Sequence, residues 1–338
     1  MSKERCYKID NLKALLIILV VVGHFIDLYA SDSDFYKSIY VCIYAFNMPL
    51  FIFISGMFYN PMKAKANSIY YLLMGLGLRY IIQLCRMIMC PGKYEFFFFE
   101  EGFIPWFAFA LSAFNIISLM LKKVNKVTLL TISIIVACIA GYVDSIDDFL
   151  CSSRIIVFFP FFIMGRMISL DKIIELSEKV INKIASYIIL FAWAGACFIC
   201  LYKVYIFRPL FTGRNPYMCN ELFHTWGAGY RLMAYIISIL TSAALLCVVP
   251  NIRIPILSEC GKRTLQVFLF HYPLQLIIMW TGIGDRMVTT YIGKIAWILV
   301  AVLLAFFLFL KIWSKPIEKM NEKWREYNGK YQASKKKR

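Results

Sequence analysis

The sequence predicts an all-α, polytopic integral membrane protein with about ten transmembrane helices and both termini in the cytoplasm. Apolar residues make up 61% of the 338 residues, charged residues make up only 17%, and the mean hydropathy is +0.67. A soluble domain of this size needs more charge, because folding leaves a large part of its surface in water. The composition therefore excludes an ordinary soluble enzyme, a disordered chain and a disulfide scaffold.

Ten apolar stretches are each roughly long enough to cross about 30 Å of hydrocarbon as a helix. Continuous apolar runs favour helices over barrel strands, which are shorter and alternate in polarity. The sixth stretch is the weakest, because Arg154 opens it, Pro160 interrupts it and Arg166 lies near its end. The stretches are Leu12–Tyr29, Ile39–Phe58, Ile69–Met89, Phe103–Leu121, Val127–Val143, Ile155–Leu170, Ala185–Ile206, Arg231–Val249, Thr264–Thr281 and Tyr291–Trp313.

The basic residues between these stretches predict the orientation of the chain. If the amino terminus is cytoplasmic, the cytoplasmic segments hold 23 Lys and Arg residues and the opposite loops hold five, as the positive-inside rule requires. We therefore predict a membrane domain over residues 1–314 and a basic cytoplasmic tail over residues 315–338. The net charge of +17 is explained by topology and by contact of Lys335–Arg338 with anionic lipid, so we expect no nucleic-acid partner.

The eleven cysteines do not predict a metal site or a disulfide framework, since their number is odd and no CxxC spacing occurs. Three of the cysteines, Cys90, Cys151 and Cys219, fall near the outer face, so one disulfide bridge between two of them is possible. The three histidines have no Glu or Cys at ligand spacing, so no metal and no tightly bound cofactor is expected. Phe96–Phe99 is interpreted as an interfacial segment on the outer side.

Charged residues inside the first apolar stretch are candidates for a functional site, because a charge at membrane depth costs about 2.5–3.5 kcal/mol. Lys13 and His24 are eleven residues apart, close to three helical turns, so both project from nearly the same face about 16 Å apart. Asp27 follows His24 at the i+3 spacing that lets side chains touch. A histidine beside a carboxylate suits general-base catalysis. The alternative is that His24 caps a helix end and Asp27 is simply solvated.

Four arginines and a second histidine also lie within the apolar stretches. Arg79 and Arg86 are seven residues apart on one helical face, and with Arg154 and Arg166 they predict a basic lining for phosphates or a carboxylate. Arg86 and Arg154 could instead extend to the interface. His271, next to Pro273, fits either a substrate-binding role or a hydrogen-bonded packing role.

Five sets of residues follow one another along the chain: Asp10–Ala14 with Val22–His24, Phe46–Phe51 with Ile54–Gly56, Trp106–Phe107, Arg154 with Phe158–Gly165, and Gly261 with Leu269–Pro273. In this order they resemble the acyltransferase-3 family of membrane acyltransferases, and Phe158–Gly165 after Arg154 is similar to its fucose 4-O-acetylase-like branch. That family begins with a basic residue, ten intervening residues and a histidine; here the basic residue is Lys13 rather than the commoner arginine.

The resemblance implies an O-acyltransferase of the bacterial inner membrane that moves an acyl group, most commonly acetyl, from acyl-CoA to a sugar hydroxyl of a cell-envelope or exported polysaccharide. It implies His24 as general base, and we add Asp27 as the group that orients it. Lys13 and the four arginines would bind donor phosphates or stabilise the oxyanion. Ser55 is either an acyl carrier or a packing residue in a small-residue notch.

Two other classes of protein stay open at this point. A polytopic transporter or lipid-linked glycan flippase also carries buried charges, and inverted repeats would favour it. The sequence contains no convincing internal duplication. A non-catalytic membrane scaffold is the second alternative, and it gives no reason for a cluster of basic residues within the membrane.

Overall fold

The computed structural model describes residues 6–89, 105–214 and 217–336, with side chains as far as residue 328 apart from Cys219. Those residues form helices and connecting turns and contain no strand. Two of the predictions above fall outside the described residues, namely the interfacial segment Phe96–Phe99 and the position of Cys90. The same holds for the side chains of Cys219 and of Lys335–Arg338. The helical architecture confirms the predicted fold class.

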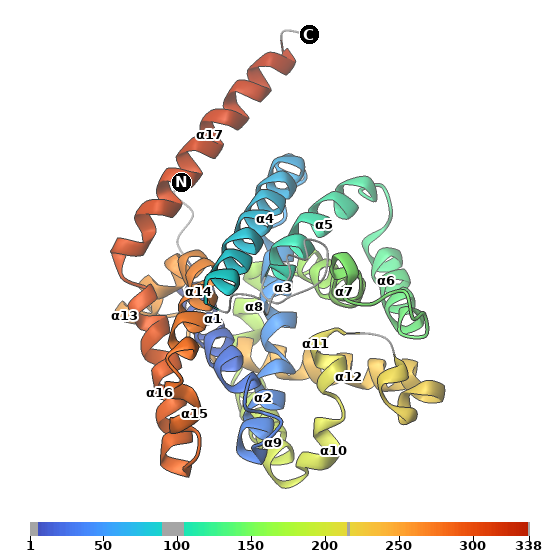
Figure 1. The fold of residues 1–338 in the computed structure, drawn as a ribbon. Helices are drawn as coiled ribbons and strands as arrows, with labels where there is room; N and C mark the ends of the chain where they lie inside the picture. The colour runs from blue at the N-terminus through green and yellow to red at the C-terminus, as the bar shows by residue number, and fades with distance from the viewer. Residues whose placement is uncertain (1–5, 90–104, 215–216, 337–338) are drawn as a thin grey trace.

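The helices follow one another with short connections (Figure 1). Their bounds are α1 (Tyr7–Asp27), α2 (Asp34–Tyr44), α3 (Asn47–Met57), α4 (Ala64–Met89), α5 (Trp106–Met120), α6 (Lys126–Ala140), α7 (Ser152–Met167), α8 (Leu170–Glu178), α9 (Val180–Ile199), α10 (Leu201–Tyr205), α11 (Arg208–Thr212), α12 (Glu221–Val248), α13 (Pro255–Cys260), α14 (Thr264–Trp280), α15 (Ile283–Met287), α16 (Tyr291–Leu308) and α17 (Ser314–Lys336), with 3-10 turns η1 (Phe149–Cys151), η2 (Tyr217–Cys219), η3 (Gly261–Arg263) and η4 (Lys311–Trp313).

Each of the ten predicted apolar stretches contains a helix. Within the described residues, seven helical segments are long and apolar enough to cross a membrane, and α2 and α3 together count as one of them. The other three stretches hold α5, α6 and α14, of 15, 15 and 17 residues. The protein is therefore a multi-pass membrane protein, while ten crossings and cytoplasmic termini stay predictions.

Helix α1 lies near the middle of the bundle, and other helices cover most of its surface (Figure 1). Leu12, Leu16 and Phe25 are fully buried. By contrast, α9 keeps most of its apolar side chains exposed, with Phe191 75% accessible. An apolar helix with this exposure fits the lipid-facing rim, because hydrocarbon solvates apolar side chains without cost.

Polar contacts hold the start of α1 against the turn that follows α12. The Lys8 amine is buried and donates to the Leu246 carbonyl at 2.8 Å, at the carbonyl end of α12. The Asn11 amide donates to the Ile252 carbonyl at 2.9 Å, and its oxygen accepts from the Ser258 hydroxyl at 2.7 Å. These contacts fix the depth of α1 in the bundle, and with it the depth of every side chain further along that helix.

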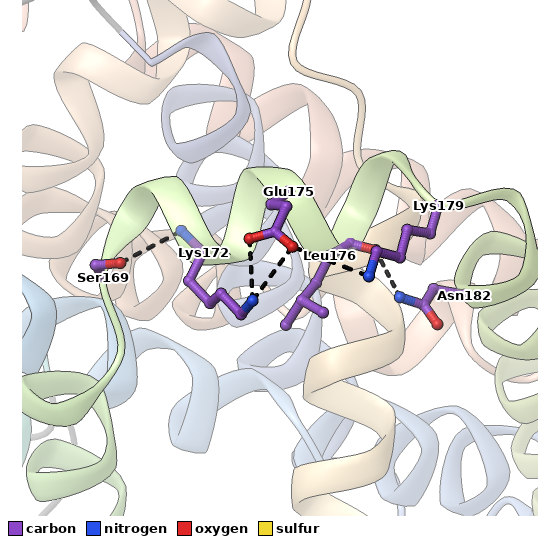
Figure 2. Close-up of polar contacts among 6 residues, drawn as sticks. All are labelled: Ser169, Lys172, Glu175, Leu176, Lys179 and Asn182. Atoms are coloured by element: carbon purple, nitrogen blue, oxygen red, sulfur yellow. Dashed lines mark hydrogen bonds and ion pairs between the residues drawn. The ribbon is translucent and has the colours of Figure 1, made fainter.

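The short helix α8 connects α7 to α9 and is held by its own polar contacts (Figure 2). Ser169 caps its start by accepting from the Lys172 backbone N–H at 3.3 Å. The Lys172 amine lies 3.0 Å from Glu175, and this hydrogen bond holds the pKa of the exposed Glu175 carboxyl below its usual value. The Asn182 amide donates to the Leu176 carbonyl at 2.7 Å and satisfies the far end of the helix.

Candidate functional site

A cavity of about 510 Å³ runs along one face of α1. The α1 residues that line it are Lys13, Ile17, Val20, His24 and Asp27. Their alternating spacing of four and three residues is that of a single helical face. Fourteen residues from Lys13 to Asp27 extend about 21 Å, which is most of a hydrocarbon core about 30 Å thick. The α1 residues that line the cavity therefore cover most of that depth.

The other walls come from helices that are distant in sequence. The chain turns at Ala45 and Phe46 between α2 and α3, so the two helices approach α1 at different depths. The remaining lining includes Tyr40 and Tyr44 from α2; Asn47, Phe51 and Ser55 from α3; Tyr71 from α4; Trp106 and Phe107 from α5; Arg154 from α7; Arg208 from α11; and Thr264, Leu265 and Phe268 from α14. The middle of the cavity is thus apolar and aromatic, with a few polar groups directed into it.

His24 lies on the cavity wall with α14 behind it. Its ring centroid is 5.5 Å from that of His271 and 6.1 Å from that of Tyr272. Neither ring nitrogen of His24 has a hydrogen-bond partner among the described residues. The His24 backbone carbonyl accepts from the Gln275 amide at 2.9 Å, which fixes the backbone and leaves the imidazole to face the cavity. The ring is therefore available to a bound molecule.

His271 is fully buried, and its tautomer is set by its surroundings. Its Nδ1 lies 2.7 Å from the Val267 carbonyl oxygen. A carbonyl only accepts, so Nδ1 carries the proton and Nε2 is left as an acceptor. Within the part of the chain that is described, Nε2 has no hydrogen-bond partner. An unpaired acceptor so close to the His24 ring is suited to receive an N–H from it.

Asp27, at the end of the cavity opposite Lys13 along α1, is paired with an arginine. Arg208 Nη2 donates to Asp27 Oδ1 at 2.8 Å, and the guanidinium lies 5.0 Å from the centroid of the Tyr40 ring. The Tyr40 and Tyr44 rings stack at 3.8 Å. Although the i+3 spacing puts Asp27 on the face of His24, no contact among the described residues joins its carboxylate to the His24 ring. The structure thus brings Asp27 to Arg208.

Arg154 of α7 and Lys13 of α1 also line the cavity. Arg154 is buried, and its guanidinium stacks on the Trp106 ring at 4.8 Å. The Lys13 amine lies 3.3 Å from Asp10 Oδ1 on the previous turn of α1. No group of three or more His, Cys, Asp or Glu that could hold a metal ion occurs among the described residues. The arrangement offers one imidazole and four basic side chains, those of Lys13, Arg154, Arg208 and Arg214, in a largely apolar space, which suits a reaction in which negative charge develops.

Comparison with known proteins assigns the chain to a family. The model of the acyltransferase-3 family, described as an acyltransferase domain, matches residues 7–314. The chain belongs to the acyltransferase-3 family. Nodulation protein NolL of Sinorhizobium fredii is 27% identical over 244 residues, which are 65% of this chain and 61% of that protein. The alignment thus covers about three fifths of this curated relative, and no solved structure matches. The protein is a multi-pass membrane protein of this family.

Five of the nine predicted site residues line the cavity: Lys13, His24, Asp27, Ser55 and Arg154. The Ser55 hydroxyl donates to the Phe51 carbonyl at 2.9 Å, one turn earlier in α3. The structure thus brings these five residues together around one cavity, while the role of each of them stays a prediction.

The other four predicted residues do not line the cavity. Arg79 is buried on α4 beside Phe109, and the Arg166 guanidinium lies over the Tyr59 ring at 4.6 Å. Arg86 donates to the hydroxyl of Tyr272, the residue that follows His271, at 2.9 Å. His271 lies behind His24. The four arginines therefore do not form one continuous lining.

Sequence reasoning missed several residues that the structure places at the site. Asn47 lies inside one of the matched motifs, and Gln275 follows His271 by one helical turn, so both could have been found from spacing. Tyr40 and Tyr44 are also one turn apart. Arg208 is one of the five basic residues that the predicted topology places in the opposite loops, and no local pattern indicates that it contacts α1.

Proposed function

We propose that this acyltransferase moves an acetyl group from acetyl-CoA to a hydroxyl of a cell-envelope or exported polysaccharide in the bacterial inner membrane. The observation that carries the proposal is the cavity along α1, with the unpaired imidazole of His24 between the basic inner end and the Asp27–Arg208 pair. Membership of the acyltransferase-3 family supports group transfer over transport of an intact solute.

The length of the donor fits the spacing of Lys13 and His24. The pantetheine arm of CoA is an extended chain comparable to roughly four to five peptide residues, or about 15 Å. Lys13 and His24 are about 16 Å apart along α1. A donor that enters from the cytoplasmic end and leaves its phosphates near Lys13 therefore carries its thioester to the level of His24.

The transfer is a single acyl exchange. His24 takes the proton of the sugar hydroxyl as that oxygen attacks the thioester carbonyl, forming the new C–O bond. The C–S bond then breaks, and the departing CoA sulfur receives the proton from His24. Arg154 stabilises the negative charge on the carbonyl oxygen during the step, because it is cationic and lies in an apolar space where charge interactions are strong.

We assign the orientation of His24 to His271 rather than to Asp27. His271 Nε2 is an acceptor without another partner among the described residues, and its ring is 5.5 Å from that of His24. His271 Nε2 accepts a hydrogen bond from the ring N–H of His24 that points away from the sugar hydroxyl. The other ring nitrogen of His24 is then unprotonated and faces the cavity, where it can act as the base. Asp27 holds Arg208 at the outer end instead.

The outer end is where we place the sugar. Tyr40 offers a ring face, while Asp27 and Arg208 offer an acceptor and donors for hydroxyl groups. A sugar held there presents a hydroxyl to His24, three residues or about 4.5 Å deeper along α1. The donor and acceptor then meet at His24 from opposite ends of one cavity.

The test uses purified protein in nanodiscs with radiolabelled acetyl-CoA, with and without bacterial envelope glycan. We expect the wild type to transfer label or to hydrolyse the thioester, and His24→Ala to lose about 10²–10⁴-fold of that rate. His224→Ala is the matched control, because His224 is exposed on α12 and absent from the cavity lining. It should retain full activity.

Each outcome has a distinct meaning. Full activity in folded His24→Ala would overturn His24 as the base while leaving an acyltransferase. Failure of folded wild type to bind acetyl-CoA would overturn the proposed donor and favour the transporter or flippase.

A further inference from the structure

A second cavity, of about 480 Å³, lies at the inner end of α14. Lys262 and Arg263 of η3, Lys311 of η4 and Glu318 of α17 contribute its charged groups. Leu265 lines both this cavity and the cavity along α1, so the two spaces are neighbours. Three cations against one carboxylate give the second cavity a preference for anions.

The walls of this cavity are held in place by contacts between helices. Arg263 donates to the Phe309 carbonyl at 2.9 Å, which joins η3 to the end of α16. The Tyr70 hydroxyl of α4 donates to Asn321 of α17 at 2.8 Å, and its ring lies 5.8 Å from that of Trp324. Although α17 leaves the bundle further along (Figure 1), its first turns are thus fixed against the membrane domain. These contacts make the cavity a built feature.

The cations keep donors for a ligand. Lys311 is exposed, and its amine has no hydrogen-bond or ion-pair partner among the described residues. Lys262 pairs with the exposed Glu259, an interaction that water screens and a phosphate can replace. Arg263 uses one of its guanidinium nitrogens on Phe309 and retains other donors.

We propose that this cavity binds the 3′-phosphorylated ADP end of acyl-CoA, with Lys262, Arg263 and Lys311 contacting its phosphates. The inference rests on the proposed use of acyl-CoA as donor. The pantetheine arm occupies the distance from Lys13 to His24, so the nucleotide has to lie beyond Lys13 at the inner end, where Leu265 separates the two cavities. The α17 wall of the subsite, with Ile317, Glu318 and Asn321, lies after residue 314, where the family match ends.

The experiment measures binding of CoA and of adenosine 3′,5′-bisphosphate to purified full-length protein in nanodiscs of neutral lipid. We expect the bisphosphate to compete with CoA. Lys311→Ala should weaken both ligands about tenfold, and Lys262→Ala with Lys311→Ala should weaken them further, because hydrogen bonds to charged groups are among the strongest. Lys323→Ala, an exposed lysine of α17 outside the cavity, is the matched control and should change neither.

The outcomes separate this subsite from the proposed function. If the wild type binds and turns over acetyl-CoA but the double variant binds CoA as tightly as the wild type, the subsite is wrong and the donor stands. If the wild type does not bind CoA at all, both are wrong. A lipid headgroup is the other source of the same phosphate chemistry. If the variants change only the response to anionic lipid, and leave CoA binding unchanged, the cavity binds lipid and the proposal is overturned.

Discussion

The close crossing of α3 and α7 allows a sharp test of the packing that holds the cavity walls. A Cβ added to Gly56 would lie 2.1 Å from the Phe162 carbonyl oxygen, and one added to Gly165 would lie 2.0 Å from the Phe53 carbonyl oxygen. The two glycines therefore let the helix backbones touch from both sides, as small residues do in membrane helix pairs. Gly56→Ala is expected to force this pair apart.

The size of the effect follows from the distances. Carbon and oxygen in such contacts normally stay about 3.3 Å apart, so α3 and α7 must separate by about 1.2 Å. Overpacking costs about 1–3 kcal/mol, and the upper end applies because the atom in the way belongs to a backbone that cannot rotate aside. Against this, alanine gains about 0.5–1 kcal/mol over glycine within a helix. We expect a net destabilisation of about 2 kcal/mol.

The assay is thermal unfolding in one detergent at one scan rate, with acetyl-transfer activity measured in parallel. Gly56→Ala and Gly165→Ala should each lower the midpoint by about 3 °C, because an unfolding entropy of about 2.1 cal/mol/K per residue over 338 residues gives about 1.4 °C for each kcal/mol. Gly77→Ala is the matched control, since it lies within α4 and a Cβ there meets nothing within 4 Å. Its midpoint should be equal or higher.

Equal midpoints for Gly56→Ala and Gly77→Ala would refute the close crossing. Activity should fall with Gly56→Ala even below the unfolding midpoint, because α3 carries Ser55 and α7 carries Arg154 into the cavity. A variant that loses stability but keeps full activity would show that the crossing supports the fold without positioning the site.

Three further substitutions test the site directly. Arg154→Lys should lower kcat about tenfold or more with folding intact, since an ammonium keeps the charge but loses the planar stack on Trp106; an unchanged kcat would contradict that role. A double-mutant cycle of Asp27→Asn and Arg208→Gln, measured on the rate of acyl transfer, should show a coupling of about 1–3 kcal/mol because the two side chains are hydrogen-bonded. Additive effects of the two substitutions would mean that the pair does not act as a unit. His271→Gln should lower kcat with little change in KM for acetyl-CoA, and a change confined to KM would return His271 to the substrate-binding role that the sequence suggested.

The sequence predicted the helices well because hydropathy is a local property. Each apolar stretch became a helix, including the weak one interrupted by Pro160, whose missing N–H is tolerated inside α7. Hydropathy could not distinguish a helix of 15 residues, such as α6, from a longer span, because the positions of helix ends depend on capping and packing. The start of α6, for example, is set by Asn125, whose side chain accepts from the Val127 backbone N–H within a single helical turn.

The face shared by Lys13 and His24 was also predictable, because a helix converts sequence spacing into direction. The partner of Asp27 was not. Local spacing favours His24, three residues away, whereas the bond actually formed is with Arg208, 181 residues along the chain. Nothing in the local pattern encodes that contact, since it depends on how α11 packs against α1 and α2.

The buried arginines show the same limit most clearly. The cost of placing a charge in the membrane identified both Arg79 and Arg154 as candidates, and both are buried. Each guanidinium lies over an aromatic ring, that of Arg79 over Phe109 and that of Arg154 over Trp106, but Arg154 lines the cavity along α1 and Arg79 does not. The two positions differ only in which side of a helix meets its neighbours. Insertion cost therefore selects the candidates for a membrane active site, and tertiary packing decides which of them can reach a substrate.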